Sequence, residues 1–501
     1  MILEPQSKFT MIRLEQLLGQ KGRLQLSNTA KKRVERAARF VSQLVKSSKP
    51  IYGVNTGFGR LAQVRISEGE LVDLQVNLLR SHASGIGEQA PGSVVRRLLL
   101  LRVLSLSKGY SGVSLPILQR HLEYLHKGLI PYIPLQGSVG ASGDLAPLAH
   151  LGLTFMGEGE FVENGKRIPS SRVLKKYNWK PLAIHPKEGL SLTNGTQFSL
   201  ALALEVLTQL QVLVSWVEVA ACLSIEAHQA TSAVFIPRIH EIKAHPKQLE
   251  IAKRFSARLR GSKHMQSHRN CDRVQDAYSF RCIPQVLGPC YSLIDSAKQL
   301  LEDEINSVSD NPVVFPVEKK IYSCGHFHAQ AVSMASDLMT MAMVTMGNLS
   351  ERRIDQIVNP LTSRSPAFLA TKPGVESGLM IVQTAAAGLA SENKTLSFPA
   401  SADTIPTNGN QEDHVSMAPW AARKSLQVLA NLRKIIAAEI LSAVRGCVHE
   451  STRTGLSFSR FVEQNLSEIA DAVPILFRAG DRVFSKDWEQ LEAYLKTKAK
   501  I

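Results

Sequence analysis

Several features that would assign a chain to a specialised class are scarce in this sequence of 501 residues. Its six cysteines are too few for a disulfide framework, so we expect reduced thiols and a cytoplasmic protein. The N-terminal residues contain no basic region followed by an apolar run, and we therefore expect no secretory signal. The longest apolar stretch, 198–223, is interrupted by Glu205 and Glu218, and it predicts a buried helix rather than a membrane span.

The common short motifs of nucleotide and hydrolase chemistry are also missing. The sequence has no GxxxxGK[ST] phosphate loop and no HExxH zinc motif, and residues 140–144 (GASGD) depart from the GxSxG nucleophile pattern at the last position. His264, His268 and Cys271 have a spacing that could hold a metal, but no fourth ligand accompanies them. We expect a solvated loop there and no metal site.

Acidic residues are outnumbered by basic ones, and the formal net charge is +16. Such a charge can attract nucleic acid. However, the basic residues are spread along the chain, and the densest cluster, Lys253 to Arg269, contains a single aromatic residue, Phe255. Because stacking of bases needs several aromatic side chains, the sequence argues against a nucleic-acid partner.

The hydrophobic pattern predicts a mainly α-helical protein with two parts. Residues 1–190 are rich in turn signals, with helices expected at 28–47, 68–83, 92–108 and 115–128 and extended pieces near 160–168. Residues 191–501 contain longer helical patterns at 195–234, 285–307, 326–358 and 411–446. Helices of this length bury their faces best in a bundle or against other subunits. The third one is rich in methionine, which is typical of an adaptable core.

The tripeptide Ala141-Ser142-Gly143 can generate an electrophile from the backbone. The unhindered nitrogen of Gly143 can attack the Ala141 carbonyl, and dehydration of Ser142 then leaves a 4-methylidene-imidazol-5-one (MIO) ring. No amino-acid side chain is a strong electrophile, so a protein that needs one must import it or build it. By itself, such a tripeptide is more typical of a turn before a helix, with Asp144 as the N-cap.

The longer segment 137–150 (GSVGASGDLAPLAH) resembles the cofactor segment of the aromatic amino acid ammonia-lyases, and most of all that of the histidase branch. Further similar segments extend from about Tyr52 to Glu450. The resemblance implies a fumarase/aspartase-like fold, in which the long helices form a central bundle and the N-terminal part carries the MIO segment. It also implies an autocatalytic MIO without an external cofactor, and a homotetramer whose active sites are shared between subunits.

The same resemblance implies the catalytic groups. Tyr52, in the segment 51–59 (IYGVNTGFG), takes the place of the family's general acid/base. A phenol titrates near pH 10, so this role requires a nearby positive charge that depresses its pKa. Tyr278 and Gln275, in the segment 275–282 (QDAYSFRC), are expected beside the electrophile.

Substrate-binding groups follow from the same segments. Arg281 presents a planar guanidinium that suits a carboxylate, and Asn194, in the segment 192–197, is expected to help it. Phe327, in the segment Gly325-His326-Phe327-His328, is expected to lie against the cofactor.

Two residues bear on the choice of substrate. His82 and Glu412 stand where relatives that act on phenylalanine carry apolar residues and glutamine. An imidazole ring needs polar partners at both nitrogens, and an apolar ring would leave both side chains unpaired at about 1–3 kcal/mol each. The sequence therefore favours elimination of ammonia from L-histidine to give trans-urocanate.

The sequence departs from the family pattern at five places, namely Thr193, Ala277, His326, Gln330 and the run Thr407-Asn408-Gly409-Asn410. Because these residues surround the site, they leave two alternatives open. One is a tyrosine or phenylalanine ammonia-lyase, or a 2,3-aminomutase, of the same family. The other is a basic scaffold or nucleic-acid-binding protein that kept the fold and lost the reaction.

Overall fold

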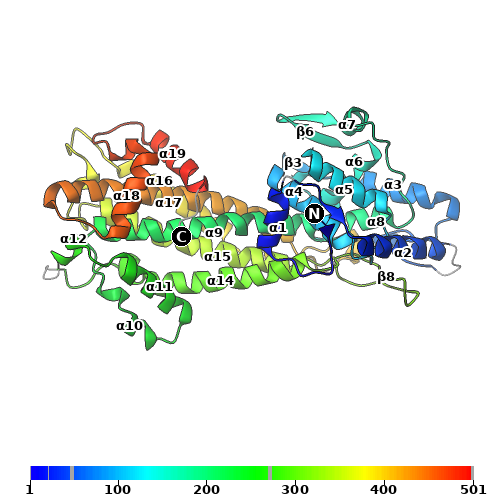
Figure 1. Cartoon of the computed structure of the whole chain (residues 1–501), viewed down its shortest axis with the longest axis horizontal. Helices are drawn as coiled ribbons and strands as arrows, with labels where there is room; N and C mark the ends of the chain where they lie inside the picture. Colours follow the sequence, from blue (N-terminus) through cyan, green and yellow to red (C-terminus); the bar gives the residue numbers. More distant parts are fainter. Residues whose placement is uncertain (1, 21, 46–49, 269–272, 498–501) are drawn as a thin grey trace. The chain divides into compact units, whose positions relative to one another are not determined.

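The computed structural model describes residues 2–20, 22–45, 50–268 and 273–497 (Figure 1). The chain forms two compact units that interleave in sequence. Unit 1 comprises Met1–Glu205, Ala297–Asp337 and Pro399–Arg423, and unit 2 comprises Val206–Ser296, Leu338–Phe398 and Lys424–Ile501. The boundary predicted near residue 190 falls inside unit 1, because the chain leaves this unit only at Glu205 and returns to it twice.

Unit 1 combines short helices with small sheets. Its helices are α1 (Met11–Gly19), α2 (Asn28–Val45), α3 (Leu71–His82), α4 (Gly92–Leu106), α5 (Leu115–Lys127), α6 (Leu145–Met156), α7 (Ser170–Lys176) and α8 (Glu188–Thr193). Its strands are β1 (Ile2–Leu3), β2 (Gln25–Leu26), β3 (Ile86–Gln89), β4 (Ile130–Pro131), β5 (Pro134–Gln136), β6 (Glu160–Glu163), β7 (Lys166–Pro169), β8 (Val313–Phe315) and β9 (Lys320–Tyr322).

The strands pair as β1–β2, β3–β5, β4–β6–β7 and β8–β9, and all pairs except the first are antiparallel. Short single-turn 3-10 helices, η1 (Gly59–Leu61), η2 (Glu68–Glu70), η5 (Ala400–Ala402) and η6 (Asn408–Asn410), complete the unit. These small sheets and turns hold the loops between the helices, and those loops line the cavity described below.

The helices of unit 1 begin and end where the sequence provides the signals. Helix α5 has Pro116 in its first turn and ends at Gly128, whose φ of 63° gives the left-handed conformation that favours glycine. Helix α4 is buried on nearly every side, and it packs against α5. A second group, α3, α6 and α8, packs together, and its ends carry several of the predicted site residues.

Unit 2 is built around the long helices α9 (Gln197–Ala227), α14 (Ile283–Ile305), α15 (Gln330–Val358) and α17 (Ala418–Thr454), each of which also gives its first or last turns to unit 1. The remaining helices are η3 (Ala233–Phe235), α10 (Pro237–Glu241), α11 (Pro246–Arg258), α12 (Lys263–Gln266), α13 (Tyr278–Arg281), η4 (Ala367–Leu369), α16 (Met380–Leu396), α18 (Arg460–Ala472), η7 (Pro474–Phe477) and α19 (Phe484–Thr497). Figure 1 shows the long helices side by side.

A buried ion pair joins the long helices of unit 2. Arg353 of α15 and Glu439 of α17 are both fully buried, and the Arg353 Nη2 atom lies 2.8 Å from Glu439 Oε2. Ser224 of α9 and Ser350 of α15 donate further hydrogen bonds to the same carboxylate. Such a pair offsets the cost of desolvation only when its remaining polar atoms are satisfied, as they are here.

The predicted mainly α-helical fold is confirmed. Helices α2 to α5 and the strands β6 and β7 lie within a few residues of the predicted ranges. The last long helix differs more: it was expected at 411–446, yet α17 begins at Ala418. Residues 407–417 instead form an irregular loop, because Thr407 and Glu412 pair through their backbones.

Helix α9 contains the long apolar stretch, and the structure supports its prediction as a buried helix. It is long and apolar enough to cross a membrane, but 67% of its most hydrophobic window is buried inside the protein. Phe198, Trp216 and Leu223 are all fully buried. This is the behaviour of a core helix.

The methionine-rich helix α15 is a core helix only in part. Met339, Met343 and Met346 are fully buried, whereas Met334 and Met341 are about half exposed, at 49% and 51%. The prediction of a methionine core is therefore wrong for these two residues, which lie on the other face of the helix.

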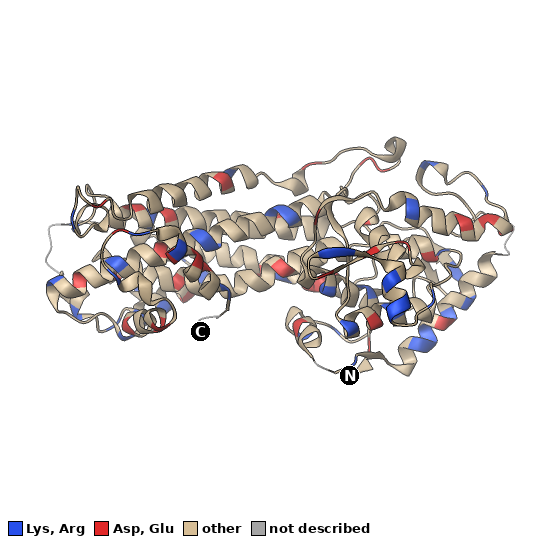
Figure 2. Ribbon diagram, turned by 90° about the horizontal axis from the view of Figure 1, so that it is seen from above, with Lys and Arg blue, Asp and Glu red and all other residues tan. Residues whose placement is uncertain are grey.

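Basic and acidic residues are interspersed along the ribbon (Figure 2). In the basic cluster that begins at Lys253, Arg254 and Arg258 both bind the buried carboxylate of Glu218. Part of that cluster is therefore neutralised within unit 2. Arg269 and Cys271 lie outside the described residues.

The described cysteines, Cys222, Cys282, Cys290, Cys324 and Cys447, are free thiols. Burial raises the pKa of Cys290 to about 12, and it raises the pKa of Cys222 and Cys447 well above the usual range. These buried thiols therefore remain protonated and unreactive at neutral pH.

Candidate active site

A cavity of about 830 Å³ in unit 1 brings together residues from distant parts of the chain. Its lining includes Tyr52, His82, Ser142, Asn194 and Glu412, which the sequence had indicated separately. Leu61, Val64, Leu74, Leu78 and Leu190 are among its apolar lining residues. A largely apolar cavity with a few convergent polar groups is the usual form of a small-molecule site.

The tripeptide lies at the wall of this cavity in a strained turn. Ser142 has a φ of 51° and Gly143 a φ of 82°, and the first of these is costly for a residue with a Cβ. Gly143 also packs against the backbone of Gly195, and a Cβ at Gly143 would overlap the Gly195 carbonyl oxygen. Only glycine fits at this position, so the nitrogen needed for ring closure stays unhindered.

Asp144 fixes the end of the tripeptide, although not in the predicted way. Its side chain makes no capping hydrogen bond to α6. Instead, its Oδ2 accepts hydrogen bonds from the backbone N–H groups of Phe198 and Ser199, both at 2.9 Å, in the first turn of α9. Burial raises the pKa of Asp144 to about 6, against the opposing effect of these hydrogen bonds. Asp144 thus occupies the N-cap position of α6 as predicted, but its carboxylate caps α9 instead of α6.

Tyr52 lies in a tight turn at the mouth of the cavity. Its hydroxyl oxygen accepts a long hydrogen bond from the Gly59 N–H, at 3.4 Å, and its ring meets Phe58 edge to face. Burial raises the pKa of Tyr52, and the carboxylate of Glu412 raises it further. A general base at this position needs a lowered pKa, so unit 1 by itself does not supply the positive charge that the role requires.

Glu412 is the centre of the polar groups in the cavity. Its Oε1 accepts a hydrogen bond from the Ser142 Oγ at 2.9 Å, and its Oε2 accepts one from the Thr407 Oγ1, also at 2.9 Å. Its negative charge also acts on Tyr52 and His82. Thr407 was named from the sequence only as the first residue of the run 407–410, whose departures from the family pattern are Asn408 and Gly409. Its hydrogen bond to Glu412 could not be read from spacing.

His82 is the last residue of α3, and its ring reaches the cavity. The Oγ of Ser81 lies 3.1 Å from the His82 Nδ1. Burial lowers the pKa of His82, against the effect of Glu412, so the imidazole is held neutral near pH 7. A neutral imidazole can donate one hydrogen bond and accept another.

Asn194 follows α8 and is only 2% exposed. Its side-chain Oδ1 has no hydrogen-bond partner in the described structure. Its backbone oxygen accepts a hydrogen bond from Arg102 Nη1 at 2.9 Å, and burial lowers the pKa of this fully buried arginine to about 10. An unpaired buried amide oxygen in a cavity is a group that a ligand can satisfy.

A buried lysine holds the helix that leads to Asn194. The Nζ of Lys187 lies 2.9 Å from the Asp310 Oδ2, and it also donates to the Ser111 carbonyl and the Ser191 hydroxyl, both at 2.8 Å. The Lys187 side chain is fully buried. Sequence reasoning missed this residue, since nothing in the pattern of α8 distinguishes it from a surface lysine.

Phe327 lies in the turn between β9 and α15, beside a second cavity of about 570 Å³. Tyr52, Ser142 and Glu412 line this cavity as well, so it adjoins the first one. Phe327 and Ser142 therefore line the same cavity of unit 1.

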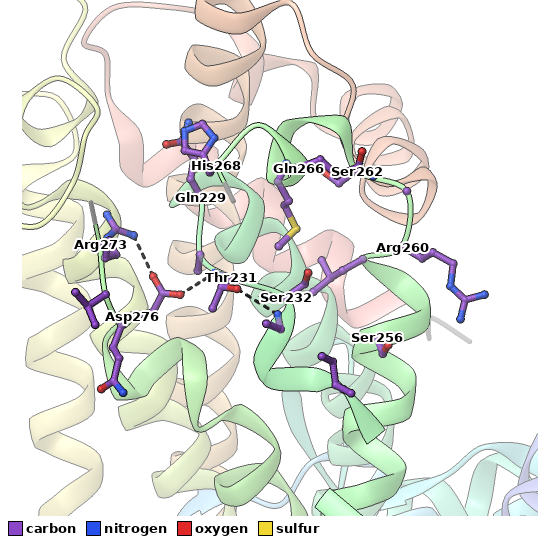
Figure 3. A pocket seen from close by; sticks show the side chains of 18 residues that line it. Gln229, Thr231, Ser232, Ser256, Arg260, Ser262, Gln266, His268, Arg273 and Asp276 are labelled. Atoms are coloured by element: carbon purple, nitrogen blue, oxygen red, sulfur yellow. Dashed lines mark hydrogen bonds and ion pairs between the residues drawn. The ribbon is translucent and has the colours of Figure 1, made fainter. Parts of the chain in front are cut away.

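Gln275, Tyr278 and Arg281 belong to unit 2. Helix α13 carries Tyr278, which is 70% exposed, and the Arg281 guanidinium carbon lies 4.7 Å from the centre of the Tyr278 ring. Gln275 lines a polar cavity of about 850 Å³ within unit 2, part of which is drawn in Figure 3. In that view Asp276 accepts hydrogen bonds from Arg273 and from the Thr231 N–H.

The spacing of His264, His268 and Cys271 was compatible with a metal site, but the surroundings of His264 are those of an ion-pair network. His264 lies between two carboxylates, with its Nδ1 3.5 Å from the Glu226 Oε2 and its Nε2 3.2 Å from the Glu450 Oε2. His268 is a neighbouring ring, and Cys271 lies outside the described residues. Among the described residues no group of three candidate ligands gathers to hold a metal.

A sequence profile of the aromatic amino acid lyases matches residues 10–469. The chain belongs to this family. It is 44% identical to a histidine ammonia-lyase of Vibrio cholerae over 92% of this chain and 90% of that protein. Among solved structures, a histidine ammonia-lyase from Trypanosoma cruzi has a TM-score of 0.89 and 37% identity, and it covers 99% of this chain and 93% of its own.

A solved structure of another kind of enzyme is equally similar in fold. A tyrosine aminomutase from Streptomyces globisporus has a TM-score of 0.90 and 31% identity, covering 98% of this chain and 96% of its own. The family predicted from the segments between Tyr52 and Glu450 is therefore confirmed. Because both kinds of enzyme share the fold, the fold alone does not select the substrate.

Proposed function

We propose that this chain is a histidine ammonia-lyase, which eliminates ammonia from L-histidine and releases trans-urocanate. The observation that carries the proposal is the Glu412 carboxylate, which lies in one cavity with Ser142, His82 and Asn194. The similarity to histidine ammonia-lyases over nine tenths of the chain supports it. The free cysteines are consistent with the reducing cytoplasm that we propose for the protein.

The tripeptide fits a methylidene-imidazolone. Gly143 fits only as glycine, and Ser142 is held by strain in a turn, which leaves the Gly143 nitrogen and the Ala141 carbonyl free of side-chain obstruction. Cyclisation of Ala141, Ser142 and Gly143 would need no external cofactor. The group supplies an electrophile that captures the substrate amine and turns it into a better leaving group.

The protein's own residues then bind the substrate and move a proton. The Asn194 Oδ1, which is buried without a partner, accepts an N–H from the bound amino acid, and its Nδ2 is available to the carboxylate. Arg281 binds that carboxylate through its planar guanidinium, and Tyr278 and Gln275 accompany it. Tyr52 removes the β-proton once the Arg281 charge opposes the effects that raise its pKa.

Two polar side chains recognise the substrate ring. His82 and Glu412 each offer one partner to an imidazole, with the Glu412 carboxylate accepting from the ring N–H. A phenyl ring would leave both of them unpaired in a largely apolar cavity, at about 1–3 kcal/mol each. Phe327 supplies an apolar ring to the adjoining cavity, which Ser142 also lines.

We propose a homotetramer with shared active sites, in which Arg281, Tyr278 and Gln275 act from a neighbouring subunit. A complementation experiment tests this arrangement. Ser142→Ala and Arg281→Ala should each be inactive alone, and co-expression of the two variants should restore part of the activity. Recovery of no activity, with both variants folded and mixed as shown by native mass spectrometry, would contradict sharing.

A mass measurement tests whether the tripeptide 141–143 has formed the methylidene-imidazolone. A deficit of two waters in the peptide 137–150 supports the electrophile, and an unmodified Ser142 in folded, active protein contradicts it. The product decides the reaction: conversion of L-histidine should create the ultraviolet absorbance of urocanate together with stoichiometric ammonia.

A tyrosine ammonia-lyase or aminomutase is the second candidate. The similarity in fold to a tyrosine aminomutase and the departure at Asn408, which lines the cavity, favour it. Values of kcat/KM for L-histidine, L-tyrosine and L-phenylalanine separate the candidates. A higher value for L-tyrosine or L-phenylalanine would replace the histidine assignment.

A further inference from the structure

The two oxygens of the Glu412 carboxylate have different partners. Oε1 accepts from the Ser142 hydroxyl, and Oε2 accepts from the Thr407 hydroxyl, each at 2.9 Å. The two partners differ chemically, because Ser142 loses its hydroxyl if the tripeptide cyclises, whereas Thr407 does not. After cyclisation Thr407 would remain as a fixed donor to this carboxylate.

Thr407 is itself held firmly. Its backbone N–H donates to the Glu412 carbonyl at 2.9 Å, and the Glu412 N–H donates back to the Thr407 carbonyl at 3.4 Å. The hydroxyl and the backbone therefore join the same two residues at three points. Such a closed loop orders the carboxylate before a ligand binds, and this ordering lowers the entropic cost of binding.

The residues between them suit this tight closure. Asn408, Gly409 and Asn410 have φ values of 51°, 61° and 64°, all in the left-handed region. Asparagine and glycine adopt this region at the lowest cost. The replacement of the family's usual Ser-Ala by Asn408-Gly409 is thus matched to the loop geometry of this chain.

A second contact anchors the loop to the rest of the site. The amide of Asn408 lies against Gly59, where a Cβ would overlap its Nδ2. The N–H of Gly59 in turn donates to the Tyr52 hydroxyl. The loop 407–412 therefore packs against the turn that carries Tyr52, and this contact helps to hold Thr407 in place within unit 1.

We propose that Thr407 is a positioning residue, which holds the Glu412 carboxylate by Oε2 so that Oε1 is free to accept the N–H of an imidazole ring in the cavity. This inference rests on the proposed function, since it takes the imidazole N–H of the substrate as the group that Glu412 binds. It adds Thr407 as the residue that keeps the Glu412 carboxylate in place.

Binding of two matched ligands tests the inference without turnover. Trans-urocanate carries the imidazole ring, and trans-cinnamate has a phenyl ring in the same position. We expect Thr407→Val to weaken trans-urocanate at least tenfold in calorimetric titration, and to weaken trans-cinnamate less than threefold. Thr407→Ser keeps the hydroxyl and should bind both ligands within threefold of the unmodified protein.

A control variant separates the hydroxyl's role from damage to the loop. Thr404 lies just before the same loop, and its hydroxyl accepts from the Val415 N–H rather than binding Glu412. Thr404→Val should leave the ratio of the two affinities unchanged. Intact mass should show the same two-water deficit in all variants, and kcat/KM for L-histidine should fall at least tenfold in Thr407→Val alone.

Three results would overturn the inference. These are unchanged trans-urocanate affinity in Thr407→Val, an equal loss for both ligands, and a Thr407→Ser variant as impaired as Thr407→Val. If the valine variant does not fold, Thr407→Ala provides the same ratio. A different result, in which the unmodified protein neither converts L-histidine nor binds trans-urocanate, would overturn the proposed function and the inference with it.

Discussion

The hydroxyl of Ser142 donates a hydrogen bond to the carboxylate of Glu412 at 2.9 Å, although the two residues lie 270 positions apart in the sequence. This contact joins the segment that can form an electrophile to the group proposed to recognise the substrate ring. Both residues line one cavity of unit 1. The first predictions below test each end of this contact.

Replacement of Ser142 by alanine should abolish turnover and leave the fold intact. The methyl group removes the hydroxyl that dehydration requires, and the loss of one hydrogen bond at the wall of a cavity costs little stability, about 0.5–1.5 kcal/mol. We expect kcat to fall by roughly a thousandfold or more, and the peptide 137–150 to have its full unmodified mass. Ser171→Ala, at an exposed serine, is the matched control. Activity close to normal in Ser142→Ala would exclude the tripeptide from the reaction.

Replacement of Glu412 by glutamine should change substrate discrimination more than stability. The amide cannot accept a charge-assisted hydrogen bond from an imidazole N–H, and such bonds are worth about 1.5–3 kcal/mol. We expect kcat/KM for L-histidine to fall by about tenfold or more relative to that for L-phenylalanine. The neighbouring exposed residue provides a control, Asp413→Asn, which should leave both values unchanged. A uniform loss for both substrates would argue against ring recognition by Glu412.

The network around His264 should make the stability of the protein depend on alkaline pH. Burial would lower the pKa of His264, but Glu226 and Glu450 outweigh it and raise the pKa to about 9. The folded-state pKa thus exceeds the unfolded value of about 6.5, so the stabilisation is complete below pH 6.5 and is lost as pH rises through 9. Arg453 and Gln229 also bind Glu450, and they remain charged or neutral, respectively, over this range.

Chemical denaturation at pH 6, 7.5 and 9.5 measures this effect. The free energy of unfolding should fall between the first and last values, and the fall should be smaller in His264→Gln. His268→Gln is the control, because burial lowers the pKa of this histidine, whereas the pKa of His264 is raised. An equal pH dependence in the unmodified protein and in His264→Gln would rule out His264 as its source.

Loss of one partner of the buried pair Lys187–Asp310 should lower the free energy of unfolding more than replacement of both partners by apolar residues. Lys187→Met leaves the Asp310 carboxylate buried without its cation, at about 3–5 kcal/mol. A double variant, Lys187→Met with Asp310→Leu, should recover much of this loss, because the uncompensated charge is removed. Lys176→Met, at the exposed pair with Glu163, should change the unfolding free energy very little. A loss as small for Lys187→Met as for Lys176→Met would contradict this interpretation.

Contiguous segments were predictable because their information is local. The turn of Tyr52, the tripeptide 141–143 and the ends of α5 depend on residues a few positions apart, and backbone preferences act over that distance. The helical period likewise predicted α14 and α15 within four residues of their bounds, whereas α9 ends seven residues before the predicted end. Prediction was weaker at the start of α17, where residues 411–417 have a helical pattern but form the loop of Glu412.

Side-chain partners could not be predicted in the same way. Asp144 has the sequence signal of an N-cap for the helix that follows it, yet it caps α9, which begins more than fifty residues later. Lys187 is fully buried, although lysines are mostly found at the surface. Each of these side chains pairs with the polar group that the packing brings near. The free-energy cost of leaving a buried polar group unpaired exceeds that of exchanging one partner for another.

The sequence by itself determined the family and the helical fold, and it predicted the tripeptide 141–143 as the source of an electrophile and the residue types of the site. These depend on local order along the chain. Only the tertiary structure decided that Thr407 holds Glu412, that Asp144 caps α9 and that Gln275, Tyr278 and Arg281 belong to a different compact unit from Ser142. The reason is physical. Contact partners such as Asp144 and α9 are distant in the sequence, so their contact depends on the packing of the whole unit rather than on any short segment.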